Sequence, residues 1–369
     1  MHISVKKDDF VAASVAVSRV ISSKTGGSSA SIRLIAENDT LILTANDLEL
    51  AISSRIKAEI IVPGSIVVPG RLLGEAARRF PHDDVTLHVM EGRQVLRISS
   101  GFSDLELVGM GAAFFPELPD VDGLKVITLP QSQLKSMLRQ VSFAMSQDSV
   151  RPILTGMLWE YKGNSLRLVA ADGTKVASRR EEISEQDDTS FSLVMPGRTV
   201  NELIRLLSDT DDEVQVAVGK SHCLIQMQET VVVTKLLEGN YINVDQYVPT
   251  NFTNVVEIKP KVLLTALDRS SVVAKDALTG IVKLSLDKQM LTIRAHSAEL
   301  GSHHEEWPVE MTGEPLEIFL NIKVLSDIMR SLDYGDATIS FTGQFGPAVC
   351  RSRINEKNYW SLVMPVRLS

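Results

Sequence analysis

The chain repeats one pattern three times, and this repeat limits the possible folds more than any other feature. Three strand-like segments end in Ala45, Ala170 and Ala295, so these alanines are 125 residues apart in both steps. A unit of about 125 residues has the usual size of one domain, and it fits nearly three times into 369 residues. We therefore predict three copies of one domain, covering residues 1–123, 124–250 and 251–369.

A second segment recurs with nearly the same spacing and predicts a short amphipathic helix in each repeat. It opens with Val68-Pro69-Gly70-Arg71, Met195-Pro196-Gly197-Arg198 and Leu320-Asn321-Ile322-Lys323. Proline suits a first helical turn, and the apolar residues that follow at i, i+3, i+4 and i+7 lie on one face. We predict these helices at 69–80, 196–207 and 321–332, and a longer helix near the start of each repeat at 6–22, 130–146 and 260–275.

Shorter runs in every repeat predict β-strands. Examples are 32–36, 156–160 and 282–286, and turn residues such as Gly219-Lys220-Ser221 separate neighbouring runs. Tight turns between consecutive strands favour antiparallel pairing. Each repeat is therefore expected to be an α+β unit in which two helices pack on antiparallel sheet.

The charged residues are divided unequally between the predicted helices and the rest of the chain. The net charge is −8, which on average argues against nucleic-acid binding. The six predicted helices nevertheless contain 15 basic and 6 acidic residues, a net charge of +9, and the remainder carries −17. In each short helix two cations are seven residues apart, and this spacing returns to the same helical face. These cations are Arg71 and Arg78, Arg198 and Arg205, and Lys323 and Arg330.

A basic helical layer on an otherwise acidic chain predicts a surface that contacts DNA phosphates through charge. Such contacts do not read the base sequence. The chain also has no helix-turn-helix, zinc-finger or basic-zipper pattern that would read it. We expect sequence-independent binding of duplex DNA.

The sequence contains no pattern typical of an active site, a cofactor site or a metal site. Gly219-Lys220-Ser221 resembles the end of a phosphate-binding loop, but Val214 stands where that loop requires its first glycine. His303 and His304 are adjacent on a predicted strand, so they point to opposite faces and do not chelate one ion together. We expect neither catalysis nor a bound cofactor.

The cellular compartment is predicted from features that secreted and membrane proteins have and this sequence lacks. No apolar run reaches the roughly 18 residues of a membrane-spanning helix, and residues 1–9 do not form a signal peptide. Cys223 and Cys350 are too few to build a disulfide framework and are expected to be buried thiols. We expect a cytoplasmic protein that does not bind membranes.

Five short motifs follow one another along the chain. They are Asp47-Leu48-Glu49, Phe115-Pro116-Glu117-Leu118-Pro119, Arg151-Pro152-Ile153-Leu154-Thr155-Gly156, Ala171-Asp172-Gly173-Thr174-Lys175-Val176-Ala177 and Val363-Met364-Pro365-Val366-Arg367-Leu368. With these motifs the chain resembles, over essentially its full length, the bacterial sliding clamps, the beta subunits of DNA polymerase III. The resemblance implies a noncatalytic processivity factor. Two three-domain chains would join head to tail into a six-domain ring, with helices facing the enclosed duplex DNA and sheets outside.

The resemblance also assigns residues to three surfaces. It adds Lys24, Gln147 and Arg151 to the helix cations at the DNA surface. It places Leu105, Val272 and Val273 in the interface of the homodimer. Between the second and third repeats it implies a pocket for short peptides of the DNA polymerase III catalytic subunit, the clamp loader, other polymerases and repair proteins. The pocket residues would be Leu154, Gly173, Thr174, Lys175, Val176, Asn321, Phe345, Pro347, Leu362, Val363, Met364, Pro365, Val366 and Arg367.

The chain departs from the usual family pattern at several positions near this pocket. Thr174 and Lys175 stand where the family usually has His and Arg, Ile242 and Gln246 stand where it usually has Pro and Arg, and Ser369 follows the customary last residue. The family's peptide preference is therefore not carried over to this chain. The alternative function is a repeat-built scaffold that binds peptides without encircling DNA, and the basic charge of all six helices favours the clamp.

Overall fold

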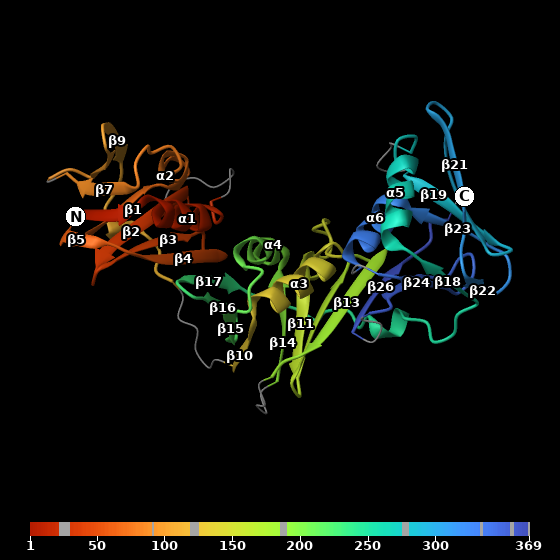
Figure 1. Cartoon of the computed structure of the whole chain (residues 1–369). Coiled ribbons are helices and arrows are strands. Elements are labelled where there is room, and N and C mark those ends of the chain that lie inside the picture. The colour runs from red at the N-terminus through yellow and green to blue at the C-terminus, as the bar shows by residue number, and fades with distance from the viewer. Residues whose placement is uncertain are drawn as a thin grey trace. The chain divides into compact units, whose positions relative to one another are not determined.

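The computed structural model describes residues 1–21, 30–90, 92–118, 125–184, 190–274, 280–332, 335–354 and 358–367 (Figure 1). The chain forms two compact units. Unit 1 consists of Met1–Leu134 and Glu202–Leu236, and unit 2 consists of Lys135–Asn201 and Leu237–Ser369. The second of the three repeats therefore contributes residues to both units.

Six α-helices lie in the described residues, and each falls within one of the six predicted ranges. The two short helices of the first two repeats begin later than predicted, because their proline is the last residue of the preceding strand and not part of the first helical turn. Pro69 has the extended angles φ −60° and ψ 114°, so the helix begins at Gly70. The helices are α1 (Lys7–Ser18), α2 (Gly70–Ala77), α3 (Gln131–Ser142), α4 (Gly197–Leu206), α5 (Pro260–Ser270) and α6 (Ile322–Ser331).

Unit 1 contains two antiparallel sheets. The five-stranded sheet has the order β5 (Glu59–Val62), β1 (His2–Lys6), β7 (Asp84–Val89), β8 (Val95–Ser100) and β9 (Ser103–Val108). The eight-stranded sheet has the order β10 (Lys125–Pro130), β15 (Glu213–Val218), β16 (His222–Met227), β17 (Thr230–Lys235), β4 (Leu50–Lys57), β3 (Thr40–Asn46), β2 (Ser31–Glu37) and β6 (Gly64–Pro69). Helices α1 and α2 contact each other, and α1 packs on β3 and β4 through buried side chains such as Phe10 and Val17.

Unit 2 also contains two antiparallel sheets. The nine-stranded sheet has the order β14 (Phe191–Pro196), β11 (Gly156–Lys162), β12 (Ser165–Ala171), β13 (Lys175–Glu182), β26 (Tyr359–Val363), β25 (Ala348–Ser352), β24 (Ala337–Phe341), β18 (Asn254–Ile258) and β22 (Met311–Thr312). The four-stranded sheet has the order β21 (Gly301–Pro308), β20 (Met290–Ser297), β19 (Ile281–Asp287) and β23 (Leu316–Asn321). Helices α5 and α6 contact each other, and α6 packs on β23 and β26.

The largest sheet of each unit joins strands from two repeats. In unit 1, β4 of the first repeat pairs with β17 of the second, and in unit 2, β13 of the second repeat pairs with β26 of the third. Counted along each repeat, β4, β13 and β21 are the third strand after the first helix, whereas β9, β17 and β26 are the last strand. Only β9 and β21 of these six strands lie at the end of a sheet in the described structure.

The structure agrees with the sequence analysis at the motifs that were interpreted as structural. Gly219-Lys220-Ser221 forms the turn between β15 and β16. Cys223 and Cys350 are free and buried, and burial raises the pKa of both thiols to about 12.

Among the described residues no helix is long and apolar enough to cross a membrane. The same residues contain no group of three or more His, Cys, Asp or Glu side chains with a metal-binding arrangement.

A buried tyrosine connects the last strand of unit 2 to two of its helices. The Tyr359 hydroxyl on β26 lies 2.6 Å from the Ser331 hydroxyl at the end of α6. It also donates to the backbone oxygen of Gln140 on α3 at 3.3 Å. Tyr359 is fully buried, and burial raises the pKa of its hydroxyl. Because a buried polar group is stabilised only by its hydrogen bonds, this contact fixes β26 against both helices.

Replacing Tyr359 with phenylalanine should destabilise unit 2 by about 1–2 kcal/mol, because the substitution removes both hydrogen bonds and leaves a buried carbonyl without its donor. The free energy of unfolding should be measured from urea titrations that monitor unit 2. Tyr247→Phe is the matched control, since Tyr247 is 52% exposed. Equal unfolding midpoints for the two variants would contradict this role of Tyr359.

Candidate functional site

The six helix cations that the sequence predicts for the DNA surface are all exposed. They are Arg71 on α2, Arg78 at its C-cap, Arg198 and Arg205 on α4, and Lys323 and Arg330 on α6. Three of them are oriented by carboxylates of their own helices: Arg71 by Glu75 at 3.1 Å, Arg205 by Glu202 at 2.7 Å and Arg330 by Asp327 at 3.1 Å. The Arg71–Glu75 pair is exposed on both sides and contributes little stability, so a phosphate can compete for the Arg71 guanidinium.

Unit 1 contains a further group of cations around an open cavity of about 940 Å³. Arg19 directly follows α1, Arg55 and Lys57 lie on β4, and Arg205 lies on α4; Asp9 and Glu229 also line the cavity. Glu202 connects two of them, with its oxygens 3.4 Å from Arg19 and 2.7 Å from Arg205. The sequence analysis missed Arg55 and Lys57 because it searched for cations on helical faces, and these two lie on a strand.

Lys24, Gln147 and Arg151 are the remaining predicted DNA contacts. Lys24 lies outside the described residues. Gln147 and Arg151 are exposed in the segment between α3 and the 3-10 helix Pro152–Thr155. This segment is ordered by its own polar groups, since Asp148 Oδ1 accepts a hydrogen bond from Val150 N at 3.0 Å.

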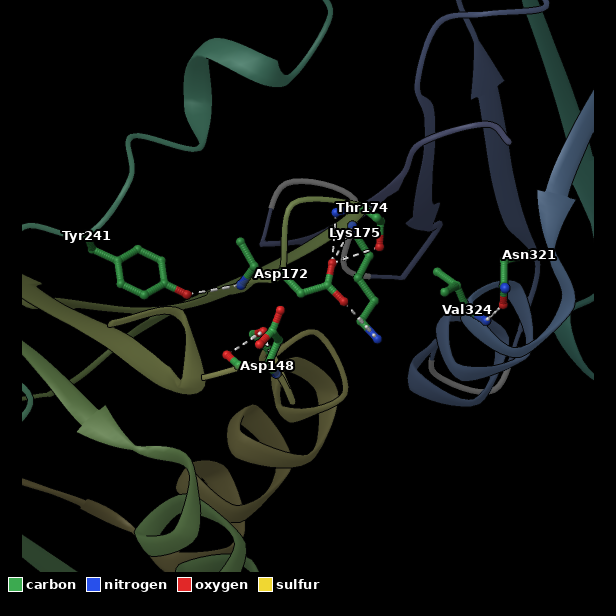
Figure 2. Close-up of polar contacts among 9 residues, drawn as sticks. Asp148, Asp172, Thr174, Lys175, Tyr241, Asn321 and Val324 are labelled. Atoms are coloured by element: carbon green, nitrogen blue, oxygen red, sulfur yellow. Dashed lines mark hydrogen bonds and ion pairs between the residues drawn. The ribbon is translucent and has the colours of Figure 1, made fainter. Parts of the chain in front are cut away.

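One carboxylate holds the turn between β12 and β13 (Figure 2). Asp172 Oδ1 accepts hydrogen bonds from Thr174 N at 2.8 Å, from Lys175 N at 3.0 Å and from the Thr174 hydroxyl at 2.8 Å. Asp172 Oδ2 lies 3.3 Å from Lys175 Nζ. Gly173 has a φ of 93°, in the left-handed region that glycine adopts without strain. The turn therefore presents exposed Thr174, while the Lys175 ammonium is held against Asp172.

The C-terminal tail forms hydrogen bonds both to this turn and to strand β23. After β26, Met364 N donates to Thr174 O at 2.8 Å, and Val366 N donates to Phe319 O on β23 at 2.8 Å. Met364 and Arg367 are exposed, and Pro365 and Val366 are half-buried. Two residues after Phe319, Asn321 Oδ1 caps α6 by accepting from Val324 N at 3.1 Å, as Figure 2 shows. The tail thus runs between two groups of predicted peptide-binding residues.

An apolar cluster lies beneath the turn and the tail. Its buried members include Val176 and Leu362 of the predicted pocket, and partly buried Ile153, Tyr241 and Ile242 pack against it. Leu154 and Val363 are also buried, whereas Phe345 is 61% exposed and Pro347 is half-buried on the loop before β25. The assignment of this surface to peptide binding stays a prediction.

Ile153 and Tyr241 were missed as members of this apolar surface. Ile153 stands inside a motif that the sequence analysis quoted, next to the predicted Leu154, and its apolar character was the available signal. Tyr241 lies in the segment between the second and third repeats, and its hydroxyl accepts a hydrogen bond from Ala171 N at 3.0 Å (Figure 2). Burial is the main cause that raises the pKa of Tyr241 to about 12, so this hydroxyl stays protonated at neutral pH.

The three predicted interface residues lie in two places, one on a strand and two directly after a helix. Leu105 is half-buried on β9 in unit 1. Val272 and Val273 directly follow α5 in unit 2, and Val272 is 60% exposed. Beside them Arg269 on α5 donates to Glu305 on β21 at 2.6 Å and 3.1 Å, and this contact lowers the pKa of the Glu305 carboxyl. Their assignment to an interface also stays a prediction.

Three family models match consecutive parts of the chain. The N-terminal domain of the DNA polymerase III beta subunit matches residues 1–119, the central domain matches residues 128–243, and the C-terminal domain matches residues 245–367. Together the three models cover nearly the whole chain.

Relatives and solved structures give the same result. The beta sliding clamp of Bacillus subtilis is 29% identical over 378 aligned residues that cover 100% of both chains. The crystal structure of the DNA polymerase sliding clamp from Bacillus subtilis matches with a TM-score of 0.95 at 28% identity, again over 100% of both chains. A sliding clamp from Pseudomonas aeruginosa, solved bound to griselimycin, matches with a TM-score of 0.94 at 27% identity and covers both chains fully.

The three-fold repeat, the six helices on antiparallel sheets and the full-length matches all lead to one assignment, which confirms the resemblance noted in the sequence. The chain belongs to the DNA polymerase III beta subunit family, the bacterial sliding clamps, which are noncatalytic processivity factors of DNA replication that bind DNA and polymerase.

Proposed function

We propose that two copies of the chain join head to tail into a ring that encircles duplex DNA in the cytoplasm. Each copy would contribute three domains, 1–123, 124–250 and 251–369. The ring would slide along DNA, because its phosphate contacts are electrostatic and do not depend on base sequence. It would hold polymerases on the template through a peptide pocket in unit 2.

The strand order is the observation that carries the head-to-tail arrangement. Within the chain, the last strand of one repeat pairs with the third strand of another, as β17 does with β4 and β26 does with β13. The last strand of the first repeat is β9, and the third strand of the third repeat is β21. Each of these two strands lies at the end of a sheet. Pairing β9 of one copy with β21 of another would repeat the internal junction, and closing it twice makes a ring.

The internal junctions also predict the register of this pairing. In both of them the third residues of the two strands lie opposite each other, Val232 opposite Ile52 and Ser361 opposite Ala177. The third residue of β9 is Leu105, and the third residue of β21 is His303. We therefore expect Leu105 of one copy to lie opposite His303 of the other.

The double variant Leu105→Cys with His303→Cys should form a disulfide between copies under oxidation, because opposite residues on paired antiparallel strands bring their Cβ atoms within reach of a disulfide. Electrophoresis without reductant should reveal a covalent dimer. The single variants are the matched controls, and the native Cys223 and Cys350 are buried. A double variant that remains monomeric after oxidation would contradict the proposed junction.

The exposed cations support the proposed DNA surface. Arg71, Arg198 and Lys323 occupy the same place in the short helix of each repeat, and each is followed seven residues later, about two helical turns, by a second exposed cation. Gln147 and Arg151 are exposed in a loop of unit 2. We include Lys24 with them as a proposed contact of the first repeat.

Combining Arg71→Glu, Arg198→Glu and Lys323→Glu should shorten retention on circular DNA by about tenfold or more, because each reversal replaces a phosphate contact with repulsion. Retention should be compared on circular and linearised DNA after loading, since a ring leaves a circle slowly but slides off free ends. A surface-binding scaffold would not distinguish the two templates.

The matched control for this triple variant combines Lys162→Glu, Lys220→Glu and Lys288→Glu, which changes the net charge equally at exposed turns between strands. This control should keep normal retention. If the helix variant were retained as long as the control variant, the proposed DNA-facing surface would be wrong.

The tail is the feature that supports a peptide pocket in unit 2. Its backbone is fixed at Thr174 and Phe319, which leaves Met364 and Arg367 exposed beside the apolar cluster. Aliphatic and Met side chains adapt to different apolar partners, and the polar groups of the turn orient a peptide backbone. The proposed partners are the DNA polymerase III catalytic subunit, the clamp loader, and other polymerases and repair proteins with clamp-binding peptides.

Deleting residues 364–369 should weaken binding of the polymerase catalytic subunit and the clamp loader by about tenfold or more, because one wall of the pocket is removed. Affinity should be measured by surface plasmon resonance with each partner immobilised. The cysteine crosslink between Leu105 and His303 serves as the internal control and should form as before. Unchanged affinity for both partners would sink the pocket assignment.

A further inference from the structure

A turn in unit 1 is held by the same kind of carboxylate frame as the β12–β13 turn. It connects β3 to β4 and contains Asp47, Leu48 and Glu49. Asp47 Oδ1 accepts hydrogen bonds from Glu49 N at 3.2 Å and Leu50 N at 2.9 Å, and Asp47 N donates to Leu50 O at 3.1 Å. Lys235, the last residue of β17, donates its N–H to Glu49 O at 2.9 Å.

Each of these hydrogen bonds has a counterpart in unit 2. Asp172 Oδ1 accepts from Thr174 N and Lys175 N at 2.8 Å and 3.0 Å, and Asp172 N donates to Lys175 O at 3.2 Å. Met364, which follows the last residue of β26, donates its N–H to Thr174 O at 2.8 Å. The backbone frame of the turn in the proposed peptide pocket is therefore present twice in the chain, with different side chains around it.

The main difference between the two turns is Leu48, which stands where unit 2 has Gly173. Leu48 has a φ of 75°, in the left-handed region that costs an ordinary L-residue about 1–2 kcal/mol. It is the one apolar residue among the non-glycine residues with positive φ in the described chain. Its backbone is held by Asn46 Oδ1, which accepts from Leu48 N at 2.8 Å. The Leu48 side chain is 69% exposed, so this strained turn presents an apolar group to solvent.

A small open cavity of about 130 Å³ adjoins Leu48. Its apolar lining comes from Leu48, Leu50, Ala51 and Val233. The segment near the end of the first repeat closes one side, because Asn46 Nδ2 donates to Glu117 O at 3.1 Å. A space of this size accepts one aliphatic side chain. Burying such a side chain is worth about 1.5–3 kcal/mol.

The charges around the cavity select the flanking residues of a ligand. Glu49 is exposed and takes part in no ion pair within the described residues, and the side chain of Glu117 is 84% exposed although it lies 3.1 Å from Arg33. Lys235 is the one lysine or arginine among the lining residues. The turn in unit 2 instead carries Lys175 and the tail carries Arg367. The unit 1 cavity therefore favours cationic ligands.

We propose that the Leu48 turn is a second peptide-docking site, which takes a short extended peptide with an aliphatic side chain beside a Lys or Arg residue. The proposal rests on the proposed peptide pocket of unit 2, whose backbone frame it repeats. Each chain would then hold two peptides of opposite charge preference at the same time, one on each unit.

The test uses the full-length protein labelled with ¹⁵N and two probe peptides, acetyl-Lys-Leu-Val-Lys-amide and acetyl-Glu-Leu-Val-Glu-amide. The cationic peptide should shift the amide signals of Leu48, Glu49 and Lys235 with a dissociation constant of about 1–5 mM. The anionic peptide should bind at least about threefold more weakly, because the cavity is rimmed by Glu49 and Glu117. Equal shifts with both peptides, or none at these amides, would overturn the proposal.

Leu48→Gly is the decisive variant, because glycine accepts a φ near 75° without strain and matches Gly173 of unit 2. The variant should fold normally and bind the cationic peptide at least about fivefold more weakly. Unchanged binding by this variant would overturn the proposal. So would amide signals of Leu48 in the intact protein that shift with protein concentration when no peptide is present. The latter result would mean that a second copy covers the turn.

The chain lacking residues 364–369 separates this site from the pocket of unit 2. It should bind the cationic peptide at Leu48 as tightly as the intact chain does. Loss of peptide binding at Leu48 in that variant would contradict an independent site in unit 1. Polymerase affinity, measured on the same variant, reports on the unit 2 pocket alone.

Discussion

The structure depends on the pairing of backbone edges between repeats. A strand at the end of a sheet exposes unpaired N–H and C=O groups. In each repeat the third strand after the first helix and the last strand would form such edges if they were not paired. The chain satisfies two of these edges internally through β4 with β17 and β13 with β26. Because both junctions use the same strand positions and the same register, the backbone itself specifies how one repeat follows another. Side chains at a junction are then free to vary.

Because the fold depends on backbone pairing, the distribution of charged side chains on the surface can vary without changing the fold. The sheets are held by backbone hydrogen bonds and by buried aliphatic side chains, so neither depends on exposed lysine or arginine. The helices can therefore concentrate cations, such as Arg198 and Lys323, on their exposed faces while the rest of the chain stays acidic. A net charge of −8 is consequently compatible with DNA binding, because it averages over two layers of opposite sign.

Much of the fold could be predicted from the sequence because its signals are local. The three short helices have a 3.6-residue apolar period, and the repeat is visible as alanines 125 residues apart. The division of each repeat between two sheets could not be predicted, because β4 and β17 are about 180 residues apart and no local pattern encodes their pairing. The same reason explains the missed Tyr241, which joins the site through its packing on the apolar cluster and its hydrogen bond from Ala171 N, about 70 residues away in the sequence. Pro69 was misplaced because the strand and the helix meet within one residue.

The chain shares its backbone with other members of its family but differs from them in most side chains, and this limits what membership says about binding preference. A TM-score of 0.95 at 28% identity to the Bacillus subtilis structure means that the frame is kept while most side chains have changed. The two turns of this chain repeat that relation internally, since Asp47 and Asp172 hold equivalent bonds around Leu48 and Gly173. Binding preference must therefore be argued from the side chains at each turn, because the frame fixes only where a ligand's backbone can lie.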